Sequence, residues 1–314
     1  MLPKPRRDGE DVRVLVTGGS GFLGSHIVDA LTAAGHDVVV FDQHESPWRT
    51  DAQEFVAGDV RDLDGVKTAV EGAAAVYHLA AVADLDDALS SPRAAMDVNV
   101  MGTVNTLEAA RQAGVERFLL ASSIYVHSDA GSVYRTSKRA AEGIARDYHQ
   151  LWGLPLTILR FGSLYGPRAD PSNAVRRLLE QALEKRRIEF WGDGTEVREY
   201  IHVSDAATLA VEALGSEFVG DVLHLTGQER ITTRELVEMI VEMMGGDIEV
   251  SYNDRPFTGR YRLTPYSYPG HSGDLGRRLT GRTHIDLGLG LLHSLNDLDR
   301  QLGSTLSRPA DDHS

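Results

Sequence analysis

Six residues near the middle of the chain, VYRTSK (Val133–Lys138), place a tyrosine four residues before a lysine. In a helix, positions i and i+4 lie side by side, so the phenol of Tyr134 and the ammonium of Lys138 would share one face. A free phenol has a pKa of about 10, and a neighbouring positive charge favours its phenolate form. Such a pair could move a proton, although the same spacing is common on solvated helix faces that do no chemistry.

Other polar residues are expected close to this pair. The strand predicted for RFLLASS (Arg117–Ser123) ends in two hydroxyls, Ser122 and Ser123, and Asn99 lies in VNVMGT on the helix before it. In an open α/β sheet, ligands bind beyond the carboxyl ends of the strands. The two serines are therefore expected at the edge of the sheet where a ligand would bind.

A glycine-rich segment follows the first predicted strand. VTGGSGFLG places Gly18, Gly21 and Gly24 between a strand and a helix. In a dinucleotide-binding loop, the first glycine forms a tight turn, the second admits the pyrophosphate and the third lets helix and strand pack closely. The N–H groups at the start of the helix would face the phosphates. This order of strand, loop and helix predicts a dinucleotide site.

Two acidic residues refine this prediction. Asp42 ends the second predicted strand, 18 residues beyond Gly24. A carboxylate there can bind both hydroxyls of an adenosine ribose and would repel a 2′-phosphate, and the following Gln43 and His44 add no arginine or lysine. NAD is therefore predicted rather than NADP, with a turn-forming aspartate as the alternative. Asp59, in AGDVRD, could reach the adenine or could simply cap a helix or turn.

The elements that must position these residues alternate between strand and helix. The first helix is predicted at Phe22–Gly35 and ends at a glycine. The predicted strands of the first half are Val12–Gly18, Asp37–Asp42, Ala74–Ala80, Arg117–Ser123 and Pro155–Phe161. This alternation predicts an α/β fold with a Rossmann-like, doubly wound parallel sheet.

The second half loses this rhythm and predicts a smaller C-terminal α/β lobe for the substrate. Asn173–Lys185 and Thr233–Gly245 are expected to be helices, EYIHV and DVLHLTG short strands, and Asn253–Arg282 has little periodicity. The predicted division is a NAD-binding domain at 1–162, a mainly substrate-binding lobe at 163–303 with some segments returning to the first domain, and a disordered tail at 304–314.

Composition and charge narrow the class of protein. The 314 residues are 42% hydrophobic and 25% charged, as in soluble globular proteins. The net charge of −14 argues against a nucleic-acid binder, and the apolar runs are too short for a membrane span or a secretory signal. The absence of cysteine excludes disulfides and thiolate chemistry. The histidines lack metal-ligand spacing, so no metal is expected, and a cytoplasmic location fits best.

Together these features resemble the extended short-chain dehydrogenase/reductase superfamily. Within it they are similar to the NAD-dependent nucleotide-sugar epimerase/dehydratase family, of the UDP-glucose 4-epimerase type. The resemblance covers nearly all of the first 215 residues. The matching segments are TGGSGFLG, GDVRD, YHLAA, NVMGT, SS, the Tyr-Lys pair, RFGSLYGPR and GDGTEVREYIHVSDAA.

The resemblance implies a role for each matching residue. Tyr134 would transfer the proton, Lys138 would hold the nicotinamide ribose, and Ser123, rather than Ser122, would bind the reacting sugar oxygen. The implied contacts with NAD are Gly18, Gly21, Phe22, Leu23, Gly24, Asp42, Asp59, Val60, Leu79, Ala80, Ala81, Asn99, Tyr134 and Lys138. The implied contacts with the substrate are Ser123, Tyr134, Ser163 and Arg198.

The residues after the serine bear on the reaction. Members that dehydrate a sugar or decarboxylate a uronic acid usually carry Asp-Glu or Ser-Glu there, whereas this chain has Ile124 and Tyr125. The resemblance therefore favours a 4-epimerase of a UDP-hexose or UDP-hexuronate that works through a transient 4-keto sugar. A sugar dehydrogenase or 4-ketoreductase is the alternative. A non-catalytic NAD-binding protein is a third, although such proteins typically lose the tyrosine or lysine.

The substrate lobe departs from the family pattern in places. After RF, many relatives carry an asparagine that contacts the diphosphate, whereas this chain has Gly162 and Ser163. Arg198 matches the arginine that grips the diphosphate, and a salt bridge to Glu196 or Glu199 is the alternative. VHS stands where relatives commonly have Val-Tyr-Gly. These differences leave open the nucleotide, the sugar, and whether the substrate is a nucleotide sugar.

Two long helices are predicted, at Leu85–Gly114 and Val133–Trp152. Relatives usually pair such helices across a two-fold axis as a four-helix bundle. The resemblance therefore implies a homodimer.

Overall fold

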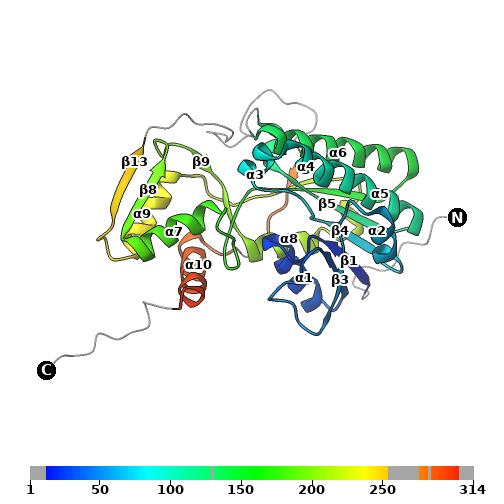
Figure 1. Ribbon diagram of the computed structural model, residues 1–314, viewed down its shortest axis with the longest axis horizontal. Helices are drawn as coiled ribbons and strands as arrows, with labels where there is room; N and C mark the ends of the chain where they lie inside the picture. The colour runs from blue at the N-terminus through cyan, green and yellow to red at the C-terminus, as the bar shows by residue number, and fades with distance from the viewer. Residues whose placement is uncertain (1–11, 129–130, 254–275, 282–283, 304–314) are drawn as a thin grey trace.

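The computed structural model of the chain describes residues 12–128, 131–253, 276–281 and 284–303 (Figure 1). Most of the segment Asn253–Arg282 and the tail predicted at 304–314 lie outside these residues. Figure 1 shows a larger lobe built on one sheet and a smaller lobe beside it.

An eight-stranded sheet forms the larger lobe. Its strands are β1 (Arg13–Thr17), β2 (Asp37–Asp42), β3 (Gln53–Ala57), β4 (Ala75–His78), β5 (Arg117–Ser123), β6 (Leu156–Phe161), β11 (Val222–Leu225) and β14 (Arg277–Arg278). They lie in the order β14-β11-β6-β5-β4-β1-β2-β3, and each neighbouring pair is parallel. The chain runs outward in opposite directions from β1 and β4, which makes their carboxyl ends the switch point where ligands bind in such sheets. The predicted doubly wound fold is confirmed.

Helices cover both faces of this sheet, as the buried side chains show. The helices around it are α1 (Phe22–Ala33), α2 (Leu63–Val70), α5 (Gly102–Ala113), α6 (Ser132–Trp152) and α8 (Val203–Glu212). One core contains apolar residues of α1 and α8, and the other contains those of α2, α5 and α6. No helix among the residues described is both long and apolar enough to cross a bilayer.

The helix predicted at Leu85–Gly114 is wrong as a single element. The segment forms α3 (Leu85–Ser90), α4 (Pro92–Met96), a π-helical turn η1 (Asp97–Met101) and then α5. Pro92 has no backbone N–H and disfavours a helical conformation at the preceding residue, which explains the break at Ser91. The prediction of the second long helix, at Val133–Trp152, was close, because α6 spans Ser132–Trp152 without interruption.

The smaller lobe has its own apolar core. Its helices are α7 (Ala174–Lys185), α9 (Thr233–Met243) and α10 (Leu287–Gln301), of which the first two were predicted. Its three strand pairs are β7 (Ser163–Tyr165) with β10 (Tyr200–His202), β9 (Val197–Arg198) with β12 (Ile231–Thr232), and β8 (Arg187–Trp191) with β13 (Glu249–Asn253).

The two lobes are connected more than once. The predicted boundary at 162 falls between β6, in the main sheet, and β7, in the smaller lobe. Further along the chain, α8 packs against α1 and β11 pairs with β6, so segments of the second half return to the main sheet. The carboxyl ends of the main strands therefore face the smaller lobe.

Candidate active site

The glycine-rich loop has the shape that its sequence predicts. Gly18 adopts φ +72°, and a Cβ there would lie 2.6 Å from the backbone N of Ala80 at the end of β4. A Cβ at Gly24 would lie 2.1 Å from Gly18 O, so the first turn of α1 packs directly on the loop. A Cβ at Gly21 would lie 3.4 Å from its nearest neighbour, Gly18 O. Gly21 is the N-cap residue of α1, and it places no side chain over the end of the helix. The loop therefore leaves backbone N–H groups open to a pyrophosphate.

Asp42 lies at the end of β2, beside this loop. Its Oδ2 accepts a hydrogen bond from Ser20 N at 3.1 Å, while Ser20 Oγ is buried and has no partner in the described part of the chain. A carboxylate and an unsatisfied hydroxyl beside an uncapped helix terminus fit the adenosine ribose and phosphates of NAD. The predicted contact itself stays a prediction.

Asp59 lies in a turn after β3 and binds Arg61. Its carboxylate accepts bonds from Arg61 Nε at 3.0 Å and from Arg61 N at 2.9 Å. The Arg61 side chain lowers the pKa of this carboxyl. Val60 beside it is buried against Gly102, so its side chain belongs to the core. The structure thus gives Asp59 a turn-stabilising role, and contact of either residue with NAD stays a prediction.

The end of β4 lies next to the loop, and contacts of Leu79, Ala80 and Ala81 with NAD stay predictions. Leu79 N donates to Thr17 O at 3.0 Å, and the half-buried Ala80 and Ala81 follow. His78 is buried and bridges two hydroxyls, Thr17 Oγ1 at 2.8 Å and Thr103 Oγ1 at 3.0 Å. Backbone from β1 and β4 therefore meets at the switch point of the sheet.

Asn99 is 1% exposed and lies in the π-helical turn η1. Its Oδ1 accepts from Val82 N at 2.7 Å, and its Nδ2 donates to Val82 O at 3.1 Å and to Ser137 Oγ at 2.9 Å. Ser137 in turn donates to Tyr134 O at 2.8 Å. Asn99 thus joins the loop after β4 to the helix that carries Tyr134, and its predicted contact with NAD stays a prediction.

The structure brings Ser123, Tyr134 and Lys138 together. Ser123 ends β5 and forms a hydrogen bond with Tyr134, and its Oγ also accepts from Tyr125 N at 3.3 Å. Lys138 is 6% exposed, and its Nζ donates to Ala121 O on the same strand at 3.0 Å. The Tyr-Lys pair therefore lies against the carboxyl end of β5 rather than on a solvated helix face.

Burial shifts the pKa of both titratable groups. It raises the pKa of Tyr134 to about 12, and the hydrogen bond with Ser123 only partly opposes this. It lowers the pKa of Lys138 to about 8, opposed by the charge of Glu142. Tyr134 is therefore a neutral phenol at neutral pH. Its ionisation needs positive charge beyond that supplied by the protein, such as the cationic ring of NAD.

Two of the four predicted substrate contacts, Ser163 and Arg198, lie in the smaller lobe. Ser163 begins β7, and Arg198 ends β9, where its Nη1 donates to Val197 O at 3.0 Å. The neighbouring Glu199 is buried and binds both Arg230, at 2.9 Å, and Arg278. The structure places Ser163 and Arg198 in the lobe that faces the main sheet, and their contacts with a substrate stay predictions.

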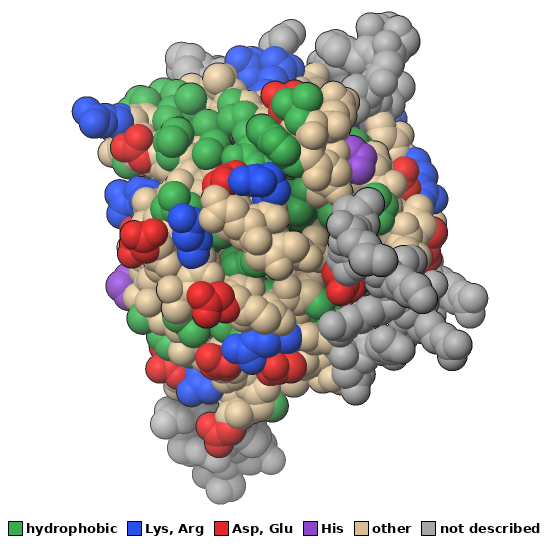
Figure 2. All heavy atoms as spheres, turned by 90° about the vertical axis from the view of Figure 1, so that its right-hand side faces the viewer, with side chains coloured by type: hydrophobic (Ala, Val, Ile, Leu, Met, Phe, Trp, Pro, Cys, Tyr) green, Lys and Arg blue, Asp and Glu red, His purple; other side chains and the backbone are tan. Residues whose placement is uncertain are grey.

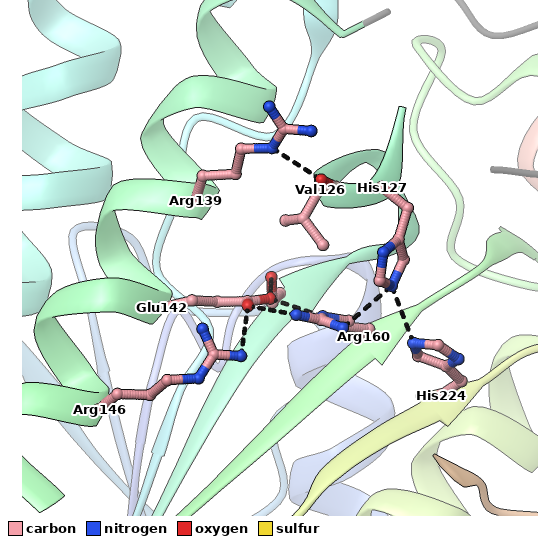
Figure 3. Close-up of polar contacts among 8 residues, drawn as sticks. Val126, His127, Arg139, Glu142, Arg146, Arg160 and His224 are labelled. Carbon is pink, nitrogen blue, oxygen red and sulfur yellow. Dashed lines mark hydrogen bonds and ion pairs between the residues drawn. The ribbon is translucent and has the colours of Figure 1, made fainter. Parts of the chain in front are cut away.

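A buried polar network behind the site was not predicted. It consists of Ser122 together with His127, Glu142, Arg160 and His224, which are labelled in Figure 3. Two signals in the sequence could have revealed part of it. Glu142 continues the four-residue spacing of Tyr134 and Lys138, and Arg160 is a charge inside the apolar strand LTILRF. The histidines carried no comparable signal, because residues 127 and 224 are far apart in the chain.

Comparisons with known proteins identify the family of the chain. The NAD dependent epimerase/dehydratase family matches residues 14–223. A putative UDP-glucose 4-epimerase of Methanocaldococcus jannaschii is 30% identical over 272 residues, which cover 80% of this chain and 88% of that protein. UDP-glucuronic acid decarboxylase 1 of Arabidopsis thaliana is also 30% identical over 277 residues, which cover 81% of this chain and 63% of the relative.

A solved structure shows the same architecture. The crystal structure of a Thermus thermophilus UDP-glucose 4-epimerase in complex with NAD has a TM-score of 0.78 and 30% identity, covering 91% of this chain and 98% of that one. Fold, loop and relatives therefore agree on the class of enzyme. The chain belongs to the NAD-dependent epimerase/dehydratase family, and NAD is its cofactor.

Proposed function

We propose that this enzyme is a 4-epimerase of a nucleotide sugar, a UDP-hexose or a UDP-hexuronate. The observation that carries the proposal is the end of β5. There Ser123 hydrogen-bonds Tyr134, and the next residues, Ile124 and Tyr125, bring no carboxylate. Epimerisation through a ketone needs one proton-transfer residue and a hydride carrier. Dehydration and decarboxylation use a further acid–base group.

The nearest carboxylate on α6 does not fill that role. Burial is the largest single influence and by itself would raise the pKa of Glu142. The hydrogen bonds from Arg160 and Ser122 and the positive charges of Arg160 and Arg146 together outweigh it, so the pKa is lowered. The carboxylate also accepts from Ser122 Oγ at 2.6 Å. A carboxylate that is ionised and fully hydrogen-bonded is a poor proton donor. This favours epimerisation over the decarboxylation named for the Arabidopsis relative.

In the proposed reaction, the phenolate form of Tyr134, which the positive charge of bound NAD would favour, takes the proton of the C4 hydroxyl of the sugar and later returns it. Ser123 holds the C4 oxygen, and Lys138 holds the nicotinamide ribose and adds positive charge near the phenol. When bound, NAD supplies the hydride acceptor and donor for C4. Return of the hydride to the opposite face of the 4-keto sugar inverts C4 with no net redox change.

We infer the binding residues from the same arrangement. Gly18, Gly21 and Gly24 would hold the pyrophosphate at the start of α1, and Asp42 the adenosine ribose. Arg198 would bind the diphosphate of the sugar, for which its planar guanidinium is suited. A UDP group is proposed because the names of the relatives specify UDP sugars.

We also propose that the enzyme is a homodimer that pairs α3 to α6 with the same helices of a second copy. On the face shown in Figure 2, hydrophobic side chains gather in the upper part, at the level where Figure 1 places α6. Exposed apolar side chains on this group of helices are Leu89, Met96, Met101, Leu151 and Trp152. Clustered apolar exposure is typical of an interaction surface.

The test is a turnover assay with purified protein. UDP-glucose, UDP-glucuronate, their galacto epimers and the corresponding dTDP and GDP sugars are supplied singly. Sugar products are separated by chromatography while NADH absorbance is followed. An epimer without net NADH is the expected result and would name the substrate. Accumulating NADH with a ketone product would replace the epimerase by a dehydrogenase. Tight NAD binding without turnover of any sugar would favour a non-catalytic protein.

A further inference from the structure

The polar network behind the site is centred on Glu142, one turn beyond Lys138 on α6. Glu142 is 2% exposed. Its carboxylate accepts from Arg160 Nε at 2.9 Å and Nη2 at 2.6 Å, from Ser122 Oγ at 2.6 Å and from Arg146 Nη2 at 3.2 Å. Figure 3 shows the Glu142 side chain reaching from α6 to Arg160 on β6. The buried charge of each partner is therefore compensated by the other.

The third guanidinium nitrogen of Arg160 contacts His127. Arg160 Nη1 lies 2.9 Å from His127 Nε2, and this same Nε2 lies 3.2 Å from His224 Nε2 on β11. A guanidinium only donates hydrogen bonds, so His127 Nε2 must be an acceptor. The His127 ring is therefore neutral, with its proton on Nδ1.

His224 is neutral as well. Burial is the main cause that lowers its pKa to about 3, and His127 and Arg160 act in the same direction. Its Nε2 can then donate to the unprotonated nitrogen of His127. At neutral pH the network thus contains the Glu142–Arg160 ion pair and two neutral imidazoles, which join α6, β6 and β11 to the segment that carries His127 (Figure 3).

That segment is a single 3₁₀ turn, η2 (Ile124–His127), directly after Ser123. At its start, Ser123 Oγ accepts from Tyr125 N. Near its end, Arg139 Nε of α6 donates to Val126 O at 2.7 Å, and His127 contacts Arg160. The orientation of the Ser123 hydroxyl is therefore coupled to the position of η2.

We propose that His127 is a positioning residue for Ser123, Tyr134 and Lys138. Its neutral imidazole, held between Arg160 and His224, anchors the end of η2 and so holds the Ser123 hydroxyl against Tyr134. The inference rests on the proposed role of Ser123 in turnover. It also gives a structural role to the histidine of VHS (Val126–Ser128).

The experiment compares His127→Leu with His127→Gln in the full-length enzyme. Leucine removes the acceptor for Arg160, whereas the amide oxygen of glutamine can restore it. His127→Leu is expected to lower kcat roughly 10- to 100-fold, because small misplacements of a catalytic group are costly, with little change in KM or NAD binding. His127→Gln is expected to recover most of the loss. The matched control is His149→Leu on α6, which removes a histidine bonded to Leu154 O and should leave kcat unchanged.

A second kinetic readout follows from the hydrogen bond between Ser123 and Tyr134, which lowers the pKa of the phenol. If η2 shifts in His127→Leu, this bond weakens and the pKa of Tyr134 rises. The acid limb of the pH profile of kcat should then move to higher pH. Lys138, the neighbouring charged group, is not altered by the substitution. A purely structural loss would lower the amount of active enzyme without moving this limb.

A crystal structure of His127→Leu decides the inference independently of turnover. Displacement of η2 and of Ser123 Oγ is the expected result, and an unmoved Ser123 would overturn it even if the wild-type enzyme were silent toward every sugar. If the wild-type enzyme turned over none of the sugars, that result would count against the proposed function alone. Should His127→Leu fail to fold, His224→Leu is the second test. It removes the partner on β11 and should shift Ser123 in the same way but less.

Discussion

Tyr134 shows how one residue depends on its surroundings. On a solvated helix its phenol would have no catalytic partner. Here burial raises its pKa to about 12, the hydrogen bond with Ser123 partly opposes this, and the buried Lys138 lies one turn further along the helix. Replacing Tyr134 by Phe should lower kcat by roughly 100- to 10,000-fold, the usual contribution of a proton-transfer residue, while NAD stays bound. Product formation and NAD content of the purified variant measure the two effects separately.

The control for this change is Tyr148→Phe on the same helix. The Tyr148 hydroxyl donates to Glu108 at 3.2 Å, in the part of α6 beyond Glu142, and its loss should leave kcat within about twofold, as for most surface substitutions. Turnover by Tyr134→Phe at the rate of this control would disprove the assigned proton transfer.

At the scale of elements, α6 serves the site at one end and exposes apolar side chains at the other. Tyr134 and Lys138 lie near its start, whereas Leu151, 69% exposed, and Trp152, 52% exposed, lie at its end. In the proposed dimer, Leu151→Glu would bury a charge in the interface. We expect the dimer dissociation constant to rise by roughly 30-fold or more, the effect of losing a contact worth about 2 kcal/mol. Sedimentation velocity over a concentration series measures it.

The matched change for this prediction is Leu292→Glu. Leu292 is 46% exposed on α10 of the smaller lobe, away from α3 to α6, so the same substitution there should leave the association state as it is. Wild-type protein that sediments only as a monomer at micromolar concentration would refute the dimer itself.

At the scale of the whole molecule, the buried histidines predict that the stability of the fold decreases in acid. Burial lowers the pKa of His78 and His224 to about 3 and that of His202 to about 4, from an ordinary value of about 6.5. Below pH 6.5 the unfolded chain binds protons at these positions and the folded chain does not. The contribution of these histidines to stability is therefore complete above pH 6.5 and falls as the pH decreases toward 4. Each histidine contributes at most ~1.4 kcal/mol per pH unit.

Thermal unfolding followed at pH 7, 6 and 5 measures this dependence. The melting temperature should change little between pH 7 and pH 6.5 and should fall between pH 6 and pH 5. A melting temperature that stayed flat down to pH 5 would mean that these histidines accept protons without unfolding, contrary to their enclosed positions.

Much of the fold follows from the sequence alone. Strands β2 and β5 have the predicted bounds, because a short apolar run between turn residues is a local signal. The glycine loop is only partly local. Gly24 is required by a contact with Gly18 within the loop, whereas Gly18 is required by its contact with Ala80 at the end of β4. The Tyr-Lys spacing and the motifs around it indicated the family, which the comparisons show.

Only the tertiary structure decided how distant segments meet. His127 and His224 lie 97 residues apart, yet their rings are in contact, and no local pattern encodes that pairing. Asn99, in the π-helical turn, likewise forms hydrogen bonds to Val82 and Ser137, 17 and 38 residues away. Local sequence determines which strand or helix forms. Which polar groups become buried together depends on how the elements pack, because only packing removes them from water.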